Sequence, residues 1–265
     1  MNPNKAVCVI SKEYDKDWIE FLNTFEEYDV YFIIDNNEVH YNDNKDFSKT
    51  NLIQIQNLQC KSNGFMGLVS LFRDRFKEVS GWDKALYYFT TINTKYDYVW
   101  FLETDVYFYS EYTLIQIDNE CQTEDLLAHG ISEHKITTAE TSFPSVWHWP
   151  SIFRNHSNVL GTPYYHCLPC HTRMSKSLLL KIKEYASKYK SLYFLEAFFP
   201  SLCVHNNMTY NNLLSFNPLS RPCEELPYDT KQRMFTTHKN SFFHPIKNTK
   251  EHTERRKLLA LNASI

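Results

Sequence analysis

Two acidic residues, Glu103 and Asp105, directly follow a run of strand-forming residues, 99–102. The run contains β-branched and aromatic residues and no charge, which is typical of the centre of a parallel sheet. In open α/β sheets, ligands bind beside the carboxyl ends of the strands, where these two carboxylates would lie. Their hard oxygen atoms suit Mg²⁺ or Mn²⁺, and such an ion would bind a diphosphate. An ordinary polar turn after a strand is the alternative interpretation.

The shortage of glycine excludes two common phosphate-binding loops. The chain of 265 residues has 5 glycines, and neither G-x-G-x-x-G nor G-x-x-x-x-G-K-[ST] occurs in it. A bound nucleotide diphosphate would therefore need a metal ion and cationic side chains. The formal net charge is -3 with both signs interspersed, so no overall basic field indicates a nucleic-acid partner.

Composition also bears on the compartment. A hydrophobic content of 43% indicates a well-filled globular core. No segment reaches the roughly 18 uninterrupted apolar residues of a membrane span, and we expect no signal peptide before the first strand. The 7 cysteines are odd in number and scattered, which fits reduced thiols. We therefore expect a cytoplasmic protein without a transmembrane segment.

The hydrophobic pattern alternates between strands and helices in the first half of the chain. This alternation predicts an α/β fold with a mostly parallel central sheet flanked by helices. No repeat or linker is visible, so we expect one catalytic domain, 1–249, with a nucleotide-binding half (1–110), an acceptor and catalytic half (111–249) and a charged tail (250–265). The expected strands are 6–11, 30–34, 52–55, 99–102, 126–129 and 167–172, and the expected helices are 15–25, 64–76, 82–91, 111–119, 176–189 and 194–205.

The acid-ended strand and the helix before it resemble a known family. The two segments read GWDKALYYF (81–89) and YDYVWFLETDVYF (96–108). They resemble the core of GT-A-fold glycosyltransferases, whose D-x-D-type motif ends a central strand. In layout and size the chain is similar to glycosyltransferase domains of large DNA viruses, which would place it in the host cytoplasm. Here the motif is E-x-D, so Glu103 would reach the metal either directly or through water.

The resemblance implies a specific set of ligands. It implies a GT-A-like, Rossmann-like sheet that binds a UDP- or GDP-sugar donor with Mn²⁺ or Mg²⁺. The acceptor would be a hydroxyl of a glycan or glycoprotein. Two other functions remain open for such a sheet. One is a nucleotidyltransferase, although Ser11–Tyr14 lacks the usual glycine-rich loop, and the other is a sugar-binding domain without catalysis.

The segment FFHPIK (242–247) supplies His244 and Lys247. The resemblance implies that a C-terminal histidine completes the metal shell and that a nearby lysine reaches the donor phosphates. A neutral imidazole is a good Mn²⁺ ligand, and an ammonium neutralises a departing diphosphate. A surface histidine beside a solvated lysine is the alternative.

Glu196 is a carboxylate among apolar neighbours such as Leu195 and Phe198. Burial raises the pKa of such a carboxyl toward the value that a general base needs. In inverting members of the family that the chain resembles, an acid from this part of the chain deprotonates the acceptor hydroxyl, and we favour inversion because Glu196 is a plausible base. That hydroxyl then attacks the anomeric carbon from the face opposite the diphosphate. The alternatives are a Glu196 on a helix surface and a buried Glu196 paired with Arg173.

Donor and acceptor contacts can also be assigned. Asp35 ends the second expected strand, where an acid can bind the base or ribose, although it would also suit a turn. Lys84 opens the helix before the central strand and is a second candidate donor contact. The indole rings of Trp147 and Trp149 can stack on sugar faces, and His148 can bind hydroxyls. A loop that fills the core is the alternative for these three residues.

Overall fold

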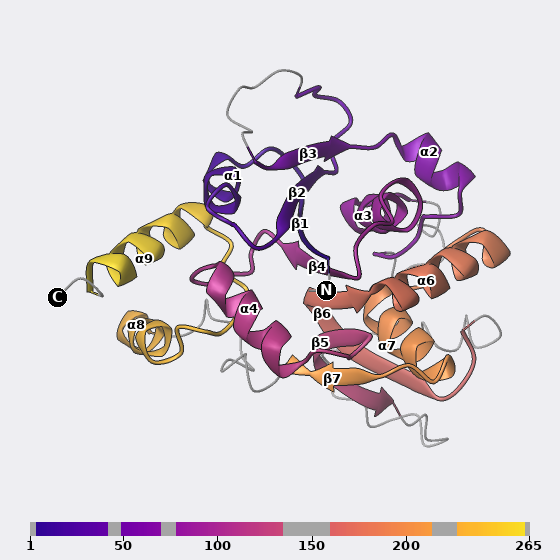
Figure 1. The fold of residues 1–265 in the computed structure, drawn as a ribbon. Coiled ribbons are helices and arrows are strands. Elements are labelled where there is room, and N and C mark those ends of the chain that lie inside the picture. The colour runs from indigo at the N-terminus through magenta and orange to yellow at the C-terminus, as the bar shows by residue number, and fades with distance from the viewer. Residues whose placement is uncertain (1–3, 42–48, 70–77, 135–159, 214–226, 263–265) are drawn as a thin grey trace.

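The computed structural model describes residues 4–41, 49–69, 78–134, 160–213 and 227–262 (Figure 1). The strands are β1 (Lys5–Ser11), β2 (Asp29–Ile34), β3 (Asn51–Gln54), β4 (Tyr98–Glu103), β5 (Leu126–His134), β6 (Tyr164–Ser175) and β7 (Tyr210–Asn212). The helices are α1 (Lys16–Leu22), α2 (Asn57–Ser62), α3 (Gly81–Tyr87), α4 (Glu111–Glu120), α6 (Lys176–Tyr189), α7 (Leu195–His205), α8 (Tyr228–Thr237) and α9 (Thr249–Asn262). A π-helical turn, η2 (Tyr88–Ile92), extends α3.

The described strands form one sheet in the order β3-β2-β1-β4-β6-β5-β7. Strands β3, β2, β1 and β4 are parallel to one another. Strand β6 runs antiparallel to both β4 and β5, whereas β7 is parallel to β5. The expected α/β fold with a mostly parallel sheet is therefore confirmed. None of the helices in the described ranges is both long and apolar enough to cross a membrane.

The central strands are buried on both faces, which explains their unbroken apolar sequences. Along β4, Val99 and Phe101 pack on one face, and Trp100 and Leu102 pack on the other. Parallel strands that are covered by helices on both sides have this pattern. Helices α2, α3, α6 and α7 lie over the first face, and α1 and α4 lie over the second, with α9 packed outside α1 (Figure 1).

A buried charge network joins the second face of β4 to its neighbours. The Asp118 carboxylate on α4 accepts hydrogen bonds from Arg173 (2.8 Å), Trp100 (3.1 Å) and Tyr28 (2.7 Å). The Lys5 ammonium lies 2.8 Å from the same carboxylate. A buried carboxylate is tolerated when its oxygens are bonded and its charge is balanced, as they are here.

The expected helix 64–76 is wrong in its described part, because the helix lies earlier in the chain. Helix α2 ends at Ser62, and Gly64 follows with a φ of +82°. A glycine with positive φ just after a helix terminates it. The residues up to 69 are not helical, and 70–77 lie outside the described residues. The strand expected at 167–172 is longer, since β6 begins at Tyr164.

Most of the region described above as a charged tail forms helix α9. His252 is buried, and its ring meets Trp18 of α1 edge-on, with 5.8 Å between centroids. The Arg256 guanidinium lies 3.3 Å from the centre of the Phe21 ring. Cations on aromatic faces are attracted by the ring quadrupole. These contacts attach α9 to α1.

Candidate functional site

The site lies where the order of the strands reverses. Strand β1 has β2 on one side and β4 on the other. The chain after β1 leads to β2, whereas the chain after β4 leads to β5 on the other side of the sheet. Open α/β sheets bind ligands at such a point. A cleft of about 250 Å³ opens there, and its lining includes Ser11, Asp35, Trp82, Glu103 and Asp105.

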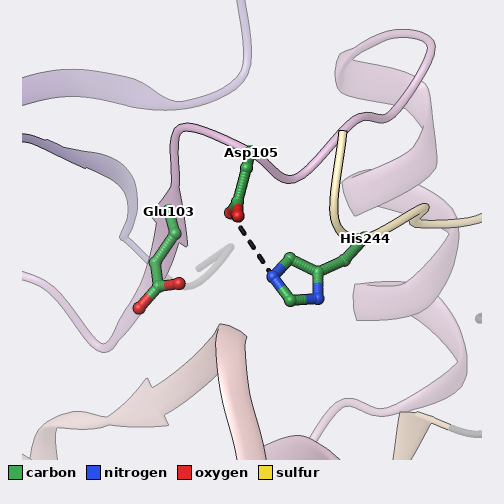
Figure 2. Close-up of side chains that lie close together, drawn as sticks. All are labelled: Glu103, Asp105 and His244. Carbon is green, nitrogen blue, oxygen red and sulfur yellow. Dashed lines mark ion pairs between the residues drawn. The ribbon is translucent and has the colours of Figure 1, made fainter. Parts of the chain in front are cut away.

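Three side chains that can bind a metal converge at this edge. Figure 2 shows Glu103 at the end of β4, Asp105 in the following turn and His244 opposite them. One ligand atom from each lies within 4.8 Å of the other two. His244 Nε2 is 3.4 Å from Asp105 Oδ1. Within the described ranges, no other group of three histidine, cysteine, aspartate or glutamate side chains comes this close together.

Main-chain hydrogen bonds bring His244 to the end of β4. Tyr107 and Phe243 exchange two N–H to C=O bonds, each 2.8 Å long. The Ile246 N–H donates to the Asp105 carbonyl at 2.7 Å. These three bonds flank His244 on both sides, so its position depends on backbone geometry. The rings of Tyr107 and Phe243 and the side chain of Ile246 then form a small apolar cluster beside the site.

Helix α9 supports the same segment from the other side. His252 Nε2 lies 2.8 Å from the Ile246 carbonyl, to which it donates a hydrogen bond. The Ile246 peptide groups are therefore bonded both to Asp105 and to α9. His252 itself is 1% exposed. The C-terminal helix thus contributes to the geometry of the site without entering it.

The donor set fits a divalent cation. Asp105 Oδ1 is buried and accepts no hydrogen bond from the described residues, and His244 Nε2 lies 3.4 Å from it. Burial raises the pKa of the Glu103 carboxyl, and the nearby Asp105 carboxylate raises it further. Two carboxylates that repel each other, beside an imidazole, match the oxygen and nitrogen ligands of Mn²⁺.

Asp35 lines the cleft, and Lys84 lies next to it. Lys84 is fully buried, and its ammonium is 2.8 Å from the Asp35 carboxylate and 3.0 Å from Asn37 Oδ1. It also bonds to the Asp35 carbonyl. Asp35 faces the cleft, so any effect of Lys84 on a donor would act through Asp35.

Glu196 lies in the first turn of α7 and is partly exposed. Burial raises the pKa of its carboxyl to about 7, and the negative charge of Glu103 contributes to the rise. The two carboxylates are thus close enough to interact. The expected alternative partner, Arg173, is bonded to Asp118 instead. Glu196 therefore has the protonation behaviour of a base near neutral pH.

The other predicted site residues either border the site or lie outside the described residues. Lys247 is exposed and lies three residues after His244 in the segment that borders the site. Trp147, His148 and Trp149 lie outside the described residues. The cleft lining also includes residues that were not predicted for the site, among them Lys12 and Trp82. Trp82 donates a 2.7 Å hydrogen bond from Nε1 to Glu103 Oε1. Trp82 lies in the first turn of the helix before the central strand, and this position is the signal in the sequence that Trp82 could lie near Glu103.

Comparisons with known proteins give only distant matches. No protein-family model matches the chain, and no curated protein does. A WbbM bifunctional glycosyltransferase is similar in structure, with 10% identity and a TM-score of 0.47 over 97% of this chain. The match covers 50% of that protein, so this chain spans half its length. The galactosyltransferase LgtC, in complex with donor and acceptor sugar analogs, has 12% identity and a TM-score of 0.44, with 96% and 95% of the two chains covered.

A third similar structure is a 4-diphosphocytidyl-2C-methyl-D-erythritol synthase from Anaerococcus prevotii. It has 10% identity and a TM-score of 0.45, with 97% and 96% of the chains covered. The names of these proteins describe different activities, and proteins of one fold can catalyse many different reactions. The function therefore has to be argued from the side chains of the site. The similarity to viral glycosyltransferase domains stays a prediction.

We expect His252 to make the protein sensitive to acid. Burial and, secondarily, the Arg256 cation lower the pKa of His252 from 6.5 to about 4. The folded state favours the neutral ring of His252 over the protonated ring. The free energy of unfolding is therefore unaffected by this histidine above pH 6.5 and decreases as the pH falls toward 4. The expected loss at pH 4 is about 3 kcal/mol. Urea unfolding of the wild type and His252→Gln from pH 8 to pH 4 measures it.

A matched control separates this histidine from the others. His238 is exposed, so His238→Gln should follow the wild-type curve of unfolding free energy against pH. The His252→Gln curve should instead be flatter, and glutamine keeps an N–H donor for the Ile246 carbonyl. A His252→Gln curve parallel to that of the wild type would contradict the expectation.

Proposed function

We propose that this chain is a metal-dependent glycosyltransferase of the GT-A type. It would transfer a sugar from a nucleotide diphosphate donor, UDP- or GDP-linked, to a hydroxyl of a glycan or glycoprotein. The single observation that supports this most strongly is the convergence of Glu103, Asp105 and His244 beside the cleft at the strand-order reversal. The buried oxygen of Asp105, which lacks a hydrogen-bond donor among the described residues, is the part of this group that most needs a cation.

The cation would be Mn²⁺ or Mg²⁺, held by Glu103, Asp105 and His244. When bound, it would neutralise charge that develops on the leaving diphosphate. Lys247, on the same segment as His244, would add a positive charge near the phosphates. Asp35 would bind the ribose or base, with Lys84 holding it in place. The cleft lacks a glycine-rich loop, so these side chains replace one.

Glu196 would act on the acceptor. With a pKa of about 7, its carboxylate can accept the proton of an acceptor hydroxyl near neutral pH. The deprotonated oxygen would attack the anomeric carbon from the face opposite the diphosphate. The bond between that carbon and the diphosphate would break, the diphosphate would leave with its electron pair, and the product would have inverted configuration. Trp147, His148 and Trp149 are the proposed acceptor subsite, where indole faces would stack on sugar rings.

Asp105→Asn should strongly weaken Mn²⁺ binding and slow sugar transfer while the protein stays folded. Loss of a carboxylate ligand should lower kcat/KM by about 10³-fold, because a bound metal supplies several kcal/mol of transition-state stabilisation. Electron paramagnetic resonance of Mn²⁺ measures binding directly, and a screen of nucleotide sugars for donor hydrolysis measures turnover.

The control for this variant is Glu13→Gln, which removes an exposed carboxylate from the loop after β1. It should bind Mn²⁺ as the wild type does. Unchanged turnover by Asp105→Asn at saturating Mn²⁺ would contradict the proposal. Metal-independent glycan binding by the wild type, with no turnover of any nucleotide sugar, would indicate a sugar-binding domain instead.

Glu196→Gln should lower kcat by about 10²- to 10⁴-fold, the usual range for loss of a general base, with Mn²⁺ affinity unchanged. In the wild type, kcat/KM should rise with pH, because the base must be unprotonated. The midpoint should be no higher than about pH 7, since a cation beside Glu103 offsets part of the repulsion that raises the pKa of Glu196.

Two results would contradict the role of Glu196. One is a kcat/KM that does not vary between pH 5 and pH 8. The other is a product of retained configuration, as determined by proton nuclear magnetic resonance of the anomeric centre. Retention would exclude simple base-assisted inversion while leaving the metal site untouched.

A further inference from the structure

Trp82 lies between the predicted metal ligands and helix α7. Its indole N–H donates to Glu103 Oε1 at 2.7 Å, and its side chain lines the cleft. Its ring lies 5.7 Å from the ring of Phe199 and 5.9 Å from that of Phe101. Trp82 is 3% exposed, so it fills the space between these groups.

The indole bond restricts the rotation of the Glu103 carboxylate. One of the two oxygens of Glu103 is occupied by the Trp82 donor, which holds the carboxylate in one orientation toward Asp105 and His244. Groups that bond to a ligand side chain set its geometry and strongly affect metal affinity. The indole nitrogen is a donor only, so it bonds the ionised carboxylate more strongly than a protonated one.

The same ring contacts the helix that carries Glu196. Phe199 follows Glu196 by three residues on α7, so both side chains are on neighbouring turns of the same face. Contact between Trp82 and Phe199 therefore fixes how far that turn lies from Glu103.

Rigid elements hold Trp82 in turn. Ser80 and Asp83 form a capping box at the start of α3, with the Ser80 N–H 2.9 Å from the Asp83 carboxylate. Gly81 lies against β1, because a Cβ there would come within 2.7 Å of the Ile10 side chain. The backbone of Trp82 is thus fixed against the central sheet before any ligand binds.

We propose that Trp82 is a positioning residue that orients Glu103 through its N–H and sets the place of the Glu196 turn through its ring. This inference rests on the proposed function, because it assumes that Glu103 binds a metal. A tryptophan that only fills the core would serve neither purpose. The two possibilities differ in what loss of the N–H alone does to metal affinity.

Trp82→Phe removes the donor and keeps an aromatic ring. We expect the Kd for Mn²⁺, measured by electron paramagnetic resonance, to rise about 10- to 100-fold. The pH midpoint of kcat/KM should stay close to that of the wild type, because the ring contact with Phe199 remains. Trp82→Leu removes the aromatic ring as well and should move this midpoint in addition.

Trp100→Phe is the matched control. Trp100 is also buried in the sheet core and also donates its N–H to a carboxylate, Asp118, at 3.1 Å. The control loses the same kind of bond at a site away from the cleft, so it should bind Mn²⁺ with wild-type affinity. Near-ultraviolet circular dichroism establishes that each variant is folded.

A second measurement uses the unaltered protein and does not depend on whether a variant folds. Titration with Mg²⁺ should move the indole N–H resonance of Trp82 in nitrogen-15 spectra and leave that of Trp100 in place. A Trp82 resonance that does not move at saturating Mg²⁺ would overturn the inference.

The variants supply further outcomes that would overturn it. These are wild-type Mn²⁺ affinity in folded Trp82→Phe, and equal losses in Trp82→Phe and Trp100→Phe. In a Glu103→Ala background, Trp82→Phe should cause no additional loss of affinity, and an undiminished extra loss would also count against it. Failure of the wild type to bind Mn²⁺ would instead reject the proposed function, so the two failures are distinguishable.

Discussion

The backbone pairing between the turn after β4 and the segment before α9 is the interaction on which the site depends. Tyr107 and Phe243 exchange two hydrogen bonds, and Ile246 adds a third to Asp105. Without these bonds, only side-chain packing and the bond from α9 would hold the His244 segment beside Glu103 and Asp105. The candidate metal site is therefore a product of tertiary structure and not of one local motif. Backbone bonds suit this purpose because they do not depend on which side chains occupy the two segments.

The rest of the fold makes that pairing stable. The parallel strands place Glu103 at the carboxyl edge of the sheet, and helices on both faces bury the strands that carry it. Helix α9 then holds the paired segment from outside through His252 and the Ile246 carbonyl. Its other contacts include Arg256, which lies on the Phe21 ring and donates a 3.2 Å hydrogen bond to the Phe108 carbonyl. Cations on ring faces are attracted by the ring quadrupole, so these contacts stabilise the packing of α9.

Features encoded locally in the sequence could be predicted, and features that depend on distant contacts could not. The uncharged run 99–102 and its acidic end predicted both β4 and the position of Glu103 and Asp105, because strand burial and the strand-end rule are local arguments. Helix α6 was predicted with the same bounds, because its apolar residues recur at helical spacing. The misplaced helix at 64–76 arose from a local ambiguity, since Gly64 ends α2 where a helix was expected to begin.

In the candidate site too, local features could be predicted from the sequence, and features that depend on distant contacts could not. His244 was expected from the resemblance, but the bonds that bring it to Asp105 join segments that no local pattern relates. Lys84 was expected at the donor, whereas the structure buries it beneath Asp35. Trp82 was not predicted as a site residue, because an aromatic residue in a helix usually lies in the hydrophobic core. Its hydrogen bond to Glu103 depends on how closely α3 approaches the sheet, which no local pattern in the sequence gives.

The most direct test of the metal site is a crystal structure of the protein grown with Mn²⁺ and a nucleoside diphosphate, with diffraction data collected at the manganese absorption edge. The expected result is one anomalous peak bonded to Asp105 and His244, with Glu103 as a direct or water-mediated ligand and the diphosphate completing the shell. A peak elsewhere, or no peak near Asp105 while the nucleotide occupies the cleft, would contradict the central claim.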